Sequence, residues 1–126
     1  MKFLLVDDSR TMRNIWKKVI AANFAGTETV EADNGEEGLK AFTEQGPFDL
    51  ALLDWNIPNM NGLELVAKIR ETDQATPLMM VTTEAEKPRI IEAIQAGVNN
   101  YVVKPFTPDG LKSKIDETLH KAEQSA

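Results

Sequence analysis

The chain has 126 residues, of which 42% are hydrophobic and 27% are charged, as is ordinary for one soluble globular domain. No apolar stretch approaches the ~20 residues of a membrane span, and the start of the chain lacks the apolar core and cleavage site of a signal peptide, so we expect no membrane insertion. The net charge of -6 without a basic cluster argues against nucleic-acid binding, and the lack of cysteine excludes thiol chemistry and suits a cytoplasmic protein.

The first apolar run, at residues 3–6, predicts a strand that stops at Asp7. Beyond it, apolar residues follow the spacing of an amphipathic helix: Met12, Ile15, Trp16, Val19 and Ile20. Asp8 and Ser9 are the candidates for its N-cap. Residues 28–32, which alternate only weakly, predict a second strand.

Three further apolar runs predict strands that stop at Asp54, Thr82 and Lys104: residues 50–53, 78–81 and 101–103. Before, between and after these runs, apolar residues at helical spacing mark four more helices: Leu39 and Phe42; Leu63, Val66 and Ile69; Ile90, Ile91 and Ile94; Leu111, Ile115 and Leu119. Thr107 and Pro108 have the character of an N-cap and a first helical residue.

Five strands that alternate with five helices predict a flavodoxin-like, doubly wound α/β fold. We expect a five-stranded parallel sheet in the order 2-1-3-4-5, with helices on both faces. No linker or low-complexity tract divides the chain, so we expect residues 1–126 to form a single domain without an output domain, with residues 123–126 frayed. We also expect a monomer.

The acids that end two of the strands predict a metal site. The carboxyl ends of parallel strands share one edge of the sheet, so Asp7, Asp8 and Asp54 should lie close together. A single strand-end aspartate is more often a cap or turn residue, but three neighbouring acids raise each other's pKa and cost stability. A hard cation such as Mg²⁺, held by carboxylate oxygens and water, would offset that cost.

Lys104 reaches the same edge from the last strand. It can act as a counter-ion to the acids or bind an incoming anion beside the metal, and the two roles are compatible. Thr82 can donate a hydrogen bond to such an anion. With no cysteine and a single histidine, His120, a carboxylate is the remaining nucleophile, and Asp54 is the best candidate because Asp7 and Asp8 are better placed to hold metal.

Several other positions carry weaker signals. Trp16 should lie in the core, whereas Trp55 adjoins the predicted site. The sequence does not decide whether the Lys104-Pro105 peptide bond is cis or trans. We interpret a few charged residues as solvated surface without a role: Glu28, Asp73, Lys17 and Lys18.

Four blocks of the sequence together resemble response-regulator receiver domains, in particular the single-domain regulators of chemotaxis: residues 5–9, 54–62, 81–84 and 96–107. The resemblance covers nearly the whole chain. It implies that Asp54 accepts a phosphoryl group from the phosphohistidine of a histidine kinase. It also implies that Mg²⁺ is held by Asp8, Asp54 and the backbone carbonyl of Asn56, with Asp7 acting through water.

The same resemblance implies a switch around the phosphoryl group. Thr82 and Lys104 would contact the phosphoryl oxygens, and Tyr101 would rotate inward as Thr82 moves. Asn56 and Glu84 would flank the acyl phosphate and influence its hydrolysis, and a phosphatase would be a further partner.

The resemblance also implies an output surface for the flagellar motor switch protein, which would include Ala85, Tyr101, Val103, Phe106 and Lys114. Two positions depart from the family pattern. Thr83 stands where many members have a smaller residue, and its bulk is expected to slow phosphoryl exchange. Glu117 stands about where the chemotaxis regulators often carry lysine, which bears on the identity of the target.

We therefore expect a signalling switch, not an enzyme, which catalyses only its own phosphorylation and dephosphorylation. A single-domain phosphorelay or phosphate-sink receiver is the alternative within the family. A hydrolase that forms an aspartyl phosphate from small molecules is disfavoured because the loops are too short for a lid or substrate pocket. A flavodoxin-like cofactor binder would need a phosphate-cradling loop after the first strand, where Asp7 and Asp8 would repel phosphate.

Overall fold

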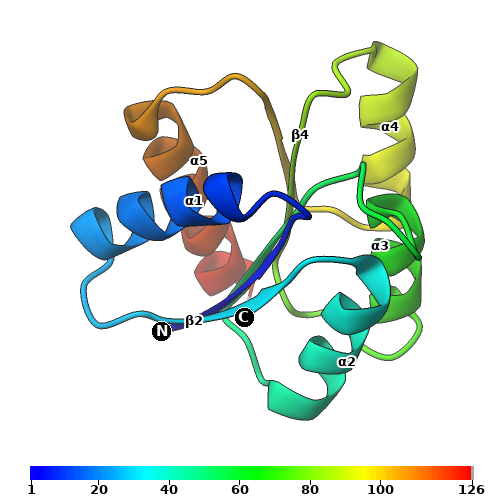
Figure 1. The fold of residues 1–126 in the computed structure, drawn as a ribbon, viewed down its shortest axis with the longest axis horizontal. Helices are drawn as coiled ribbons and strands as arrows, with labels where there is room; N and C mark the ends of the chain where they lie inside the picture. The colour runs from blue at the N-terminus through cyan, green and yellow to red at the C-terminus, as the bar shows by residue number, and fades with distance from the viewer. Residues whose placement is uncertain (126) are drawn as a thin grey trace.

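The computed structural model describes residues 1–125, and its five parallel strands lie in the order β2-β1-β3-β4-β5 (Figure 1). The strands are β1 (Lys2–Val6), β2 (Glu28–Ala32), β3 (Leu50–Leu53), β4 (Leu78–Thr82) and β5 (Asn100–Val103). Every pair of neighbours is parallel. The predicted fold class and strand order are confirmed.

The helices cover both faces of the sheet. They are α1 (Arg10–Asn23), α2 (Gly35–Gln45), α3 (Gly62–Arg70), α4 (Lys87–Ala96) and α5 (Pro108–Ser125). Helices α1 and α5 lie on one face, and α2, α3 and α4 lie on the other (Figure 1). Within the described residues, no helix combines the length and apolar character that crossing a bilayer requires.

The central strands are buried on both faces, and this is why their sequences are continuous apolar runs. In β1, Leu4 and Val6 pack toward α2 and α3, while Phe3 and Leu5 pack toward α1 and α5. All four side chains are fully buried, and such burial stabilises the fold by roughly 1.5–3 kcal/mol for each large aliphatic or aromatic side chain. The core therefore fixes the sheet whose edge carries the polar strand ends.

Side-chain hydrogen bonds cap the beginnings of α1 and α5. Ser9 caps α1, because its hydroxyl accepts a hydrogen bond from the Met12 N–H at 3.2 Å. Of the two candidates for this role, Ser9 is thus the N-cap and Asp8 is free to point elsewhere. Thr107 accepts a hydrogen bond from the Gly110 N–H at 3.0 Å, with Pro108 as the first residue of α5, as predicted.

The spacing of apolar residues predicts α4 correctly but not the residues that this helix buries. Ala93 is the fully buried residue of α4, whereas Ile91 and Ile94 are 44% and 56% exposed. Helix α4 connects β4 to the edge strand β5 and lies beside α3 at that end of the sheet (Figure 1). The three predicted apolar residues, Ile90, Ile91 and Ile94, are therefore more than α4 buries at the edge of the sheet.

The interpretation of Asp73 as a solvated charge is wrong. Its carboxylate accepts hydrogen bonds from the N–H groups of Ala75 and Thr76, both at 2.9 Å, and from the Thr76 hydroxyl at 2.8 Å. Burial alone would raise the pKa of Asp73, but these bonds outweigh it and lower the pKa. Asp73 thus orders the turn that leads into β4.

Helix α5 continues to Ser125, which is further than the expected fraying at residues 123–126 allows. Residue 126, the last of that predicted segment, lies outside the described residues.

Candidate functional site

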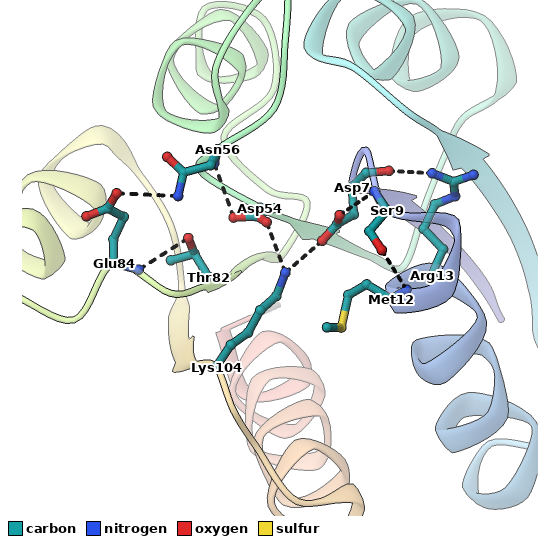
Figure 2. Close-up of polar contacts among 9 residues, drawn as sticks. All are labelled: Asp7, Ser9, Met12, Arg13, Asp54, Asn56, Thr82, Glu84 and Lys104. Atoms are coloured by element: carbon teal, nitrogen blue, oxygen red, sulfur yellow. Dashed lines mark hydrogen bonds and ion pairs between the residues drawn. The ribbon is translucent and has the colours of Figure 1, made fainter.

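The candidate site lies at the carboxyl ends of the strands, as the topology predicts. Strands β1 and β3 are neighbours, with Val6 opposite Leu53 in the register, so the next residues, Asp7 and Asp54, extend from the same level of the sheet. The Asp54 N–H donates to the Val6 carbonyl at 3.0 Å and continues the ladder to the site. Figure 2 shows both carboxylates facing one another across a lysine side chain.

That lysine is Lys104, and its ammonium bridges the two acids. Its Nζ donates to Asp7 Oδ2 at 2.8 Å and to Asp54 Oδ2 at 2.9 Å (Figure 2). All three groups are nearly buried, because Asp7 is 1% exposed, Asp54 is 7% exposed and the side chain of Lys104 is 11% exposed. The structure therefore brings together three residues that are distant in the sequence.

The Lys104-Pro105 peptide bond, for which the sequence did not decide between cis and trans, is cis.

Burial and ion pairing act against each other on the charges of this bridge. Burial raises the pKa of the Asp7 carboxyl, although the hydrogen bonds from Lys104 and the Ser9 N–H oppose the rise. For Lys104, burial alone would lower the pKa, but the bonds and charges of Asp7 and Asp54 outweigh it and raise the pKa. Lys104 is therefore a cation at neutral pH.

The backbone holds the second oxygen of each carboxylate. Asp7 Oδ1 accepts from the Ser9 N–H at 2.8 Å, and Asp54 Oδ1 accepts from the Asn56 N–H at 3.2 Å. A guanidinium N–H of Arg13 also donates to the Asp7 carbonyl. Each acid thus has one oxygen fixed by the main chain and one by Lys104, which sets the orientation of both.

The third predicted acid, Asp8, lies apart from this bridge and is exposed. Within residues 1–125, no group of three acidic, histidine or cysteine side chains is arranged as a set of metal ligands. Lys104 offsets part of the repulsion between Asp7 and Asp54, as its counter-ion role predicts, and leaves one negative charge of the pair unbalanced. The donors available here, carboxylate and carbonyl oxygens, are those that Mg²⁺ prefers, so the site fits the ion chemically and the metal stays a prediction.

A second group of predicted residues lies at the end of β4. Thr82 is fully buried, and its hydroxyl accepts from the Glu84 N–H at 3.4 Å. The Asn56 side-chain amide donates to Glu84 Oε1 at 3.3 Å (Figure 2). The Tyr101 hydroxyl donates to the Glu84 carbonyl at 2.6 Å. Tyr101 is therefore bonded to the loop between β4 and α4 in this structure, and its inward rotation on switching stays a prediction.

Tyr101 is expected to ionise at unusually high pH. Burial raises its pKa from 10.0 to about 12, and the charges of Glu84 and Asp54 add to the rise. Because the folded pKa exceeds the unfolded one, Tyr101 stabilises the fold below about pH 10, and this contribution is lost between pH 10 and 12. Tyr101 is the single tyrosine, so the ultraviolet absorbance of phenolate follows it directly, with circular dichroism to verify that the chain stays folded. The chain unfolded in urea should titrate near 10; the same midpoint in the folded chain would mean that the ring is not buried.

The residues predicted for an output surface are half-buried or exposed: Ala85, Tyr101, Val103, Phe106 and Lys114. Lys114 pairs with Glu117 at 3.8 Å, so the departure at Glu117 partly neutralises that lysine. Thr83 is exposed beside the site.

Sequence reasoning missed two cations near the site. Arg13 supports the Asp7 backbone and pairs with Glu31 at 2.9 Å. Arg89 places its guanidinium 5.3 Å from the centroid of the Trp55 ring. An arginine six residues after Asp7, in the first turn of a helix, is a usable signal for the first contact. Nothing local in the sequence indicates the second.

The fold and the site define the class of protein: a flavodoxin-like α/β protein whose strand ends hold two buried aspartates bridged by one lysine. Over residues 3–116 the sequence matches the family described as the response regulator receiver domain, and the chain belongs to that family.

The relatives agree with this assignment. A chemotaxis protein CheY homolog of Campylobacter jejuni is 46% identical over 121 residues, which are 94% of this chain and 92% of the relative. The chemotaxis protein CheY of Pseudomonas aeruginosa is 45% identical over 123 residues, 96% of this chain and 98% of the relative. The structure of a CheY-like response regulator receiver domain protein from Methanospirillum hungatei superposes with a TM-score of 0.89 at 32% identity, and covers 99% of this chain and 98% of that one. The predicted resemblance is confirmed: this is a CheY-like receiver, consistent with chemotaxis signalling, and such domains are switches and not classical enzymes.

Proposed function

We propose that this chain is a phosphorylation-activated response regulator of a two-component system, in which Asp54 accepts a phosphoryl group from a histidine kinase. The observation that carries the proposal is the buried ion pair of Asp54 and Lys104 at 2.9 Å, with Asp7 bonded to the same ammonium at 2.8 Å. A carboxylate fixed beside a cation, at the ligand-binding edge of a doubly wound sheet, is suited to phosphoryl transfer.

In the transfer, a carboxylate oxygen of Asp54 attacks phosphorus. The O–P bond forms as the N–P bond to the kinase histidine breaks, and the electron pair returns to the imidazole nitrogen. Lys104 then exchanges a carboxylate partner for a phosphoryl oxygen, and the Thr82 hydroxyl donates to another. The chain positions the acceptor and neutralises charge, which is the main requirement of this chemistry.

Mg²⁺ is the cofactor of the proposal. Asp8, Asp54 and the backbone carbonyl of Asn56 would hold it, with Asp7 acting through water, and it would supply positive charge for the phosphoryl oxygens. Asp8 is exposed, and Asp7 pairs with Lys104. Neither acid therefore completes a set of metal ligands in this structure.

Signalling would start at Thr82. If its hydroxyl turns to a phosphoryl oxygen, it gives up the Glu84 N–H, and the Glu84 carbonyl is the acceptor of the Tyr101 hydroxyl. The phosphoryl group would thus bias a two-state arrangement of the loop and Tyr101. Asn56 and Glu84, which are bonded to each other, would flank the acyl phosphate and modulate its hydrolysis, alone or with a phosphatase.

The proposed output is the flagellar motor switch protein, bound by a monomeric receiver. The surface would include Ala85, Tyr101, Val103, Phe106 and Lys114, and the names of the chemotaxis relatives support this target. A phosphorelay or phosphate-sink receiver is the second candidate, favoured by Glu117, whose charge opposes that of Lys114. Binding of the phosphorylated chain to a peptide from a motor switch protein separates the two.

Mg²⁺ followed by acetyl phosphate tests the proposal. Mg²⁺ should raise the melting temperature, because it binds the folded site and not the unfolded chain; a concentration of 100 times the dissociation constant stabilises by about 2.7 kcal/mol. Acetyl phosphate should then add the mass of one phosphoryl group, and only with Mg²⁺ present. Ca²⁺ at equal concentration distinguishes stabilisation by general charge screening from support of phosphorylation. An unchanged melting curve together with an unchanged mass would refute the proposal.

A further inference from the structure

Trp16 lies beneath the candidate site although it belongs to the core. It stands on α1, is fully buried and packs in the cluster between the sheet and helices α1 and α5. The Nζ of Lys104 lies 5.7 Å from the centroid of its ring. That distance is within the range over which a cation is attracted to the face of an indole.

The choice of tryptophan here has a cost that a simpler core residue would avoid. Among the described residues, the indole N–H of Trp16 has no hydrogen-bond partner. A buried donor without a partner is unfavourable, and phenylalanine or leucine would carry no such donor. Of the aromatic residues, tryptophan offers a cation the most favourable face. The contact with Lys104 therefore gives a reason for tryptophan at this position.

The ammonium of Lys104 has three attractive contacts within residues 1–125: Asp7, Asp54 and the Trp16 ring. In the proposed function the ammonium exchanges the Asp54 carboxylate for a phosphoryl oxygen, and Asp7 also acts on the metal through water. The ring takes part in neither change. The attraction between the Trp16 ring and the Lys104 ammonium therefore persists while the ammonium passes from a carboxylate to a phosphoryl oxygen.

We propose that Trp16 is a positioning residue for phosphoryl transfer, whose indole face holds the ammonium of Lys104 in place while its anionic partners change. This inference rests on the proposed function. It predicts a contact that exists before any chemistry and a loss of rate when the ring is removed.

The test compares Trp16→Leu and Trp16→Phe with Ile20→Ala. Ile20 is on the same buried face of α1 and in the same core cluster, so its variant reports general damage to that core. With saturating Mg²⁺, Trp16→Leu should be phosphorylated by acetyl phosphate about fivefold more slowly, and Trp16→Phe about twofold more slowly. Ile20→Ala should keep the rate, and all variants should keep the dissociation constant for Mg²⁺.

A spectroscopic readout detects the contact itself. Protons above an aromatic face resonate upfield, so the ε-methylene signal of Lys104 should lie upfield of other lysines in carbon-13-labelled protein, with Lys104→Ala identifying it. The shift should be smaller in Trp16→Phe and absent in Trp16→Leu. Should Trp16→Leu fail to fold, the graded shift and twofold loss in Trp16→Phe still decide the matter.

Equal slowing in Ile20→Ala, or a Lys104 signal without an upfield shift in the parent chain, would overturn the role of Trp16. The proposed function fails in a different way, namely when the parent chain takes up no phosphoryl group at all. The upfield shift does not depend on phosphorylation, so the two failures are distinguishable.

Discussion

Asp54→Asn is expected to abolish phosphorylation and to leave the fold intact. Asparagine keeps the shape of the side chain and can still accept a hydrogen bond from Lys104, but its amide is not a nucleophile toward phosphorus. The change also removes one of two neighbouring negative charges, and Lys104 retains Asp7 as its partner at 2.8 Å. We expect the free energy of unfolding to stay within about 1 kcal/mol of the parent value or to rise. Intact mass after acetyl phosphate, together with urea unfolding, measures both effects.

Asp109→Asn is the matched control, because it makes the same chemical change at an exposed position in the first turn of α5. It should be phosphorylated at the parent rate. Phosphorylation that persists in Asp54→Asn would move the acceptor to Asp7 or Asp8. A loss of more than about 3 kcal/mol would show instead that the buried ion pair, and not the acceptor role, dominates at this position.

Lys104→Ala is expected to have the largest effect on stability and to impair the switch. It would leave Asp7 and Asp54 buried beside one another without the cation that both carboxylates share. Removal of one partner from a buried ion pair costs about 3–5 kcal/mol. The rate of phosphorylation should fall by a factor of about 100 or more, since a positioned cation next to the phosphoryl oxygens is lost. Melting curves and phosphorylation rates, with and without Mg²⁺, check both expectations.

Two further variants interpret the result for Lys104. Lys68→Ala removes an exposed lysine that pairs with Glu71 at 3.7 Å and should change neither stability nor rate appreciably. The double variant Asp54→Asn, Lys104→Ala should recover part of the lost stability, because only one unpaired carboxylate remains. Mg²⁺ binding should survive in Lys104→Ala. Its loss would assign Lys104 a purely structural role in shaping the acidic site.

The strands were predictable because the burial that marks them is local, whereas their order followed from the doubly wound pattern. Apart from the terminal residues Lys2 and Thr82, β1, β3 and β4 consist of buried apolar residues, so each strand is an apolar run whatever its neighbours are. Alternation with helices then restricts the sheet to parallel crossovers of one hand. The meeting of Asp7, Asp54 and Lys104 followed, because the ends of parallel strands share an edge.

The arrangement of charge within the site was less predictable. Sequence reasoning placed both Asp7 and Asp8 at the metal site, but successive side chains leaving a strand point in opposite directions. Asp7 is buried against Lys104, and Asp8 is exposed. The counter-ion role of Lys104 was one of two possibilities until the distances of 2.8 and 2.9 Å were known. A sequence lists the charges that reach an edge, while their pairing depends on side-chain directions.

The sequence by itself determined the fold class, the strand order, the family and the residues that reach the functional edge. The tertiary structure alone decided which contacts these residues make: Trp16 under Lys104, Arg89 over Trp55, and Asp73 within its turn. The reason is physical. Periodicity records whether a residue faces the core or the solvent, whereas a contact between two segments depends on where packing places both of them.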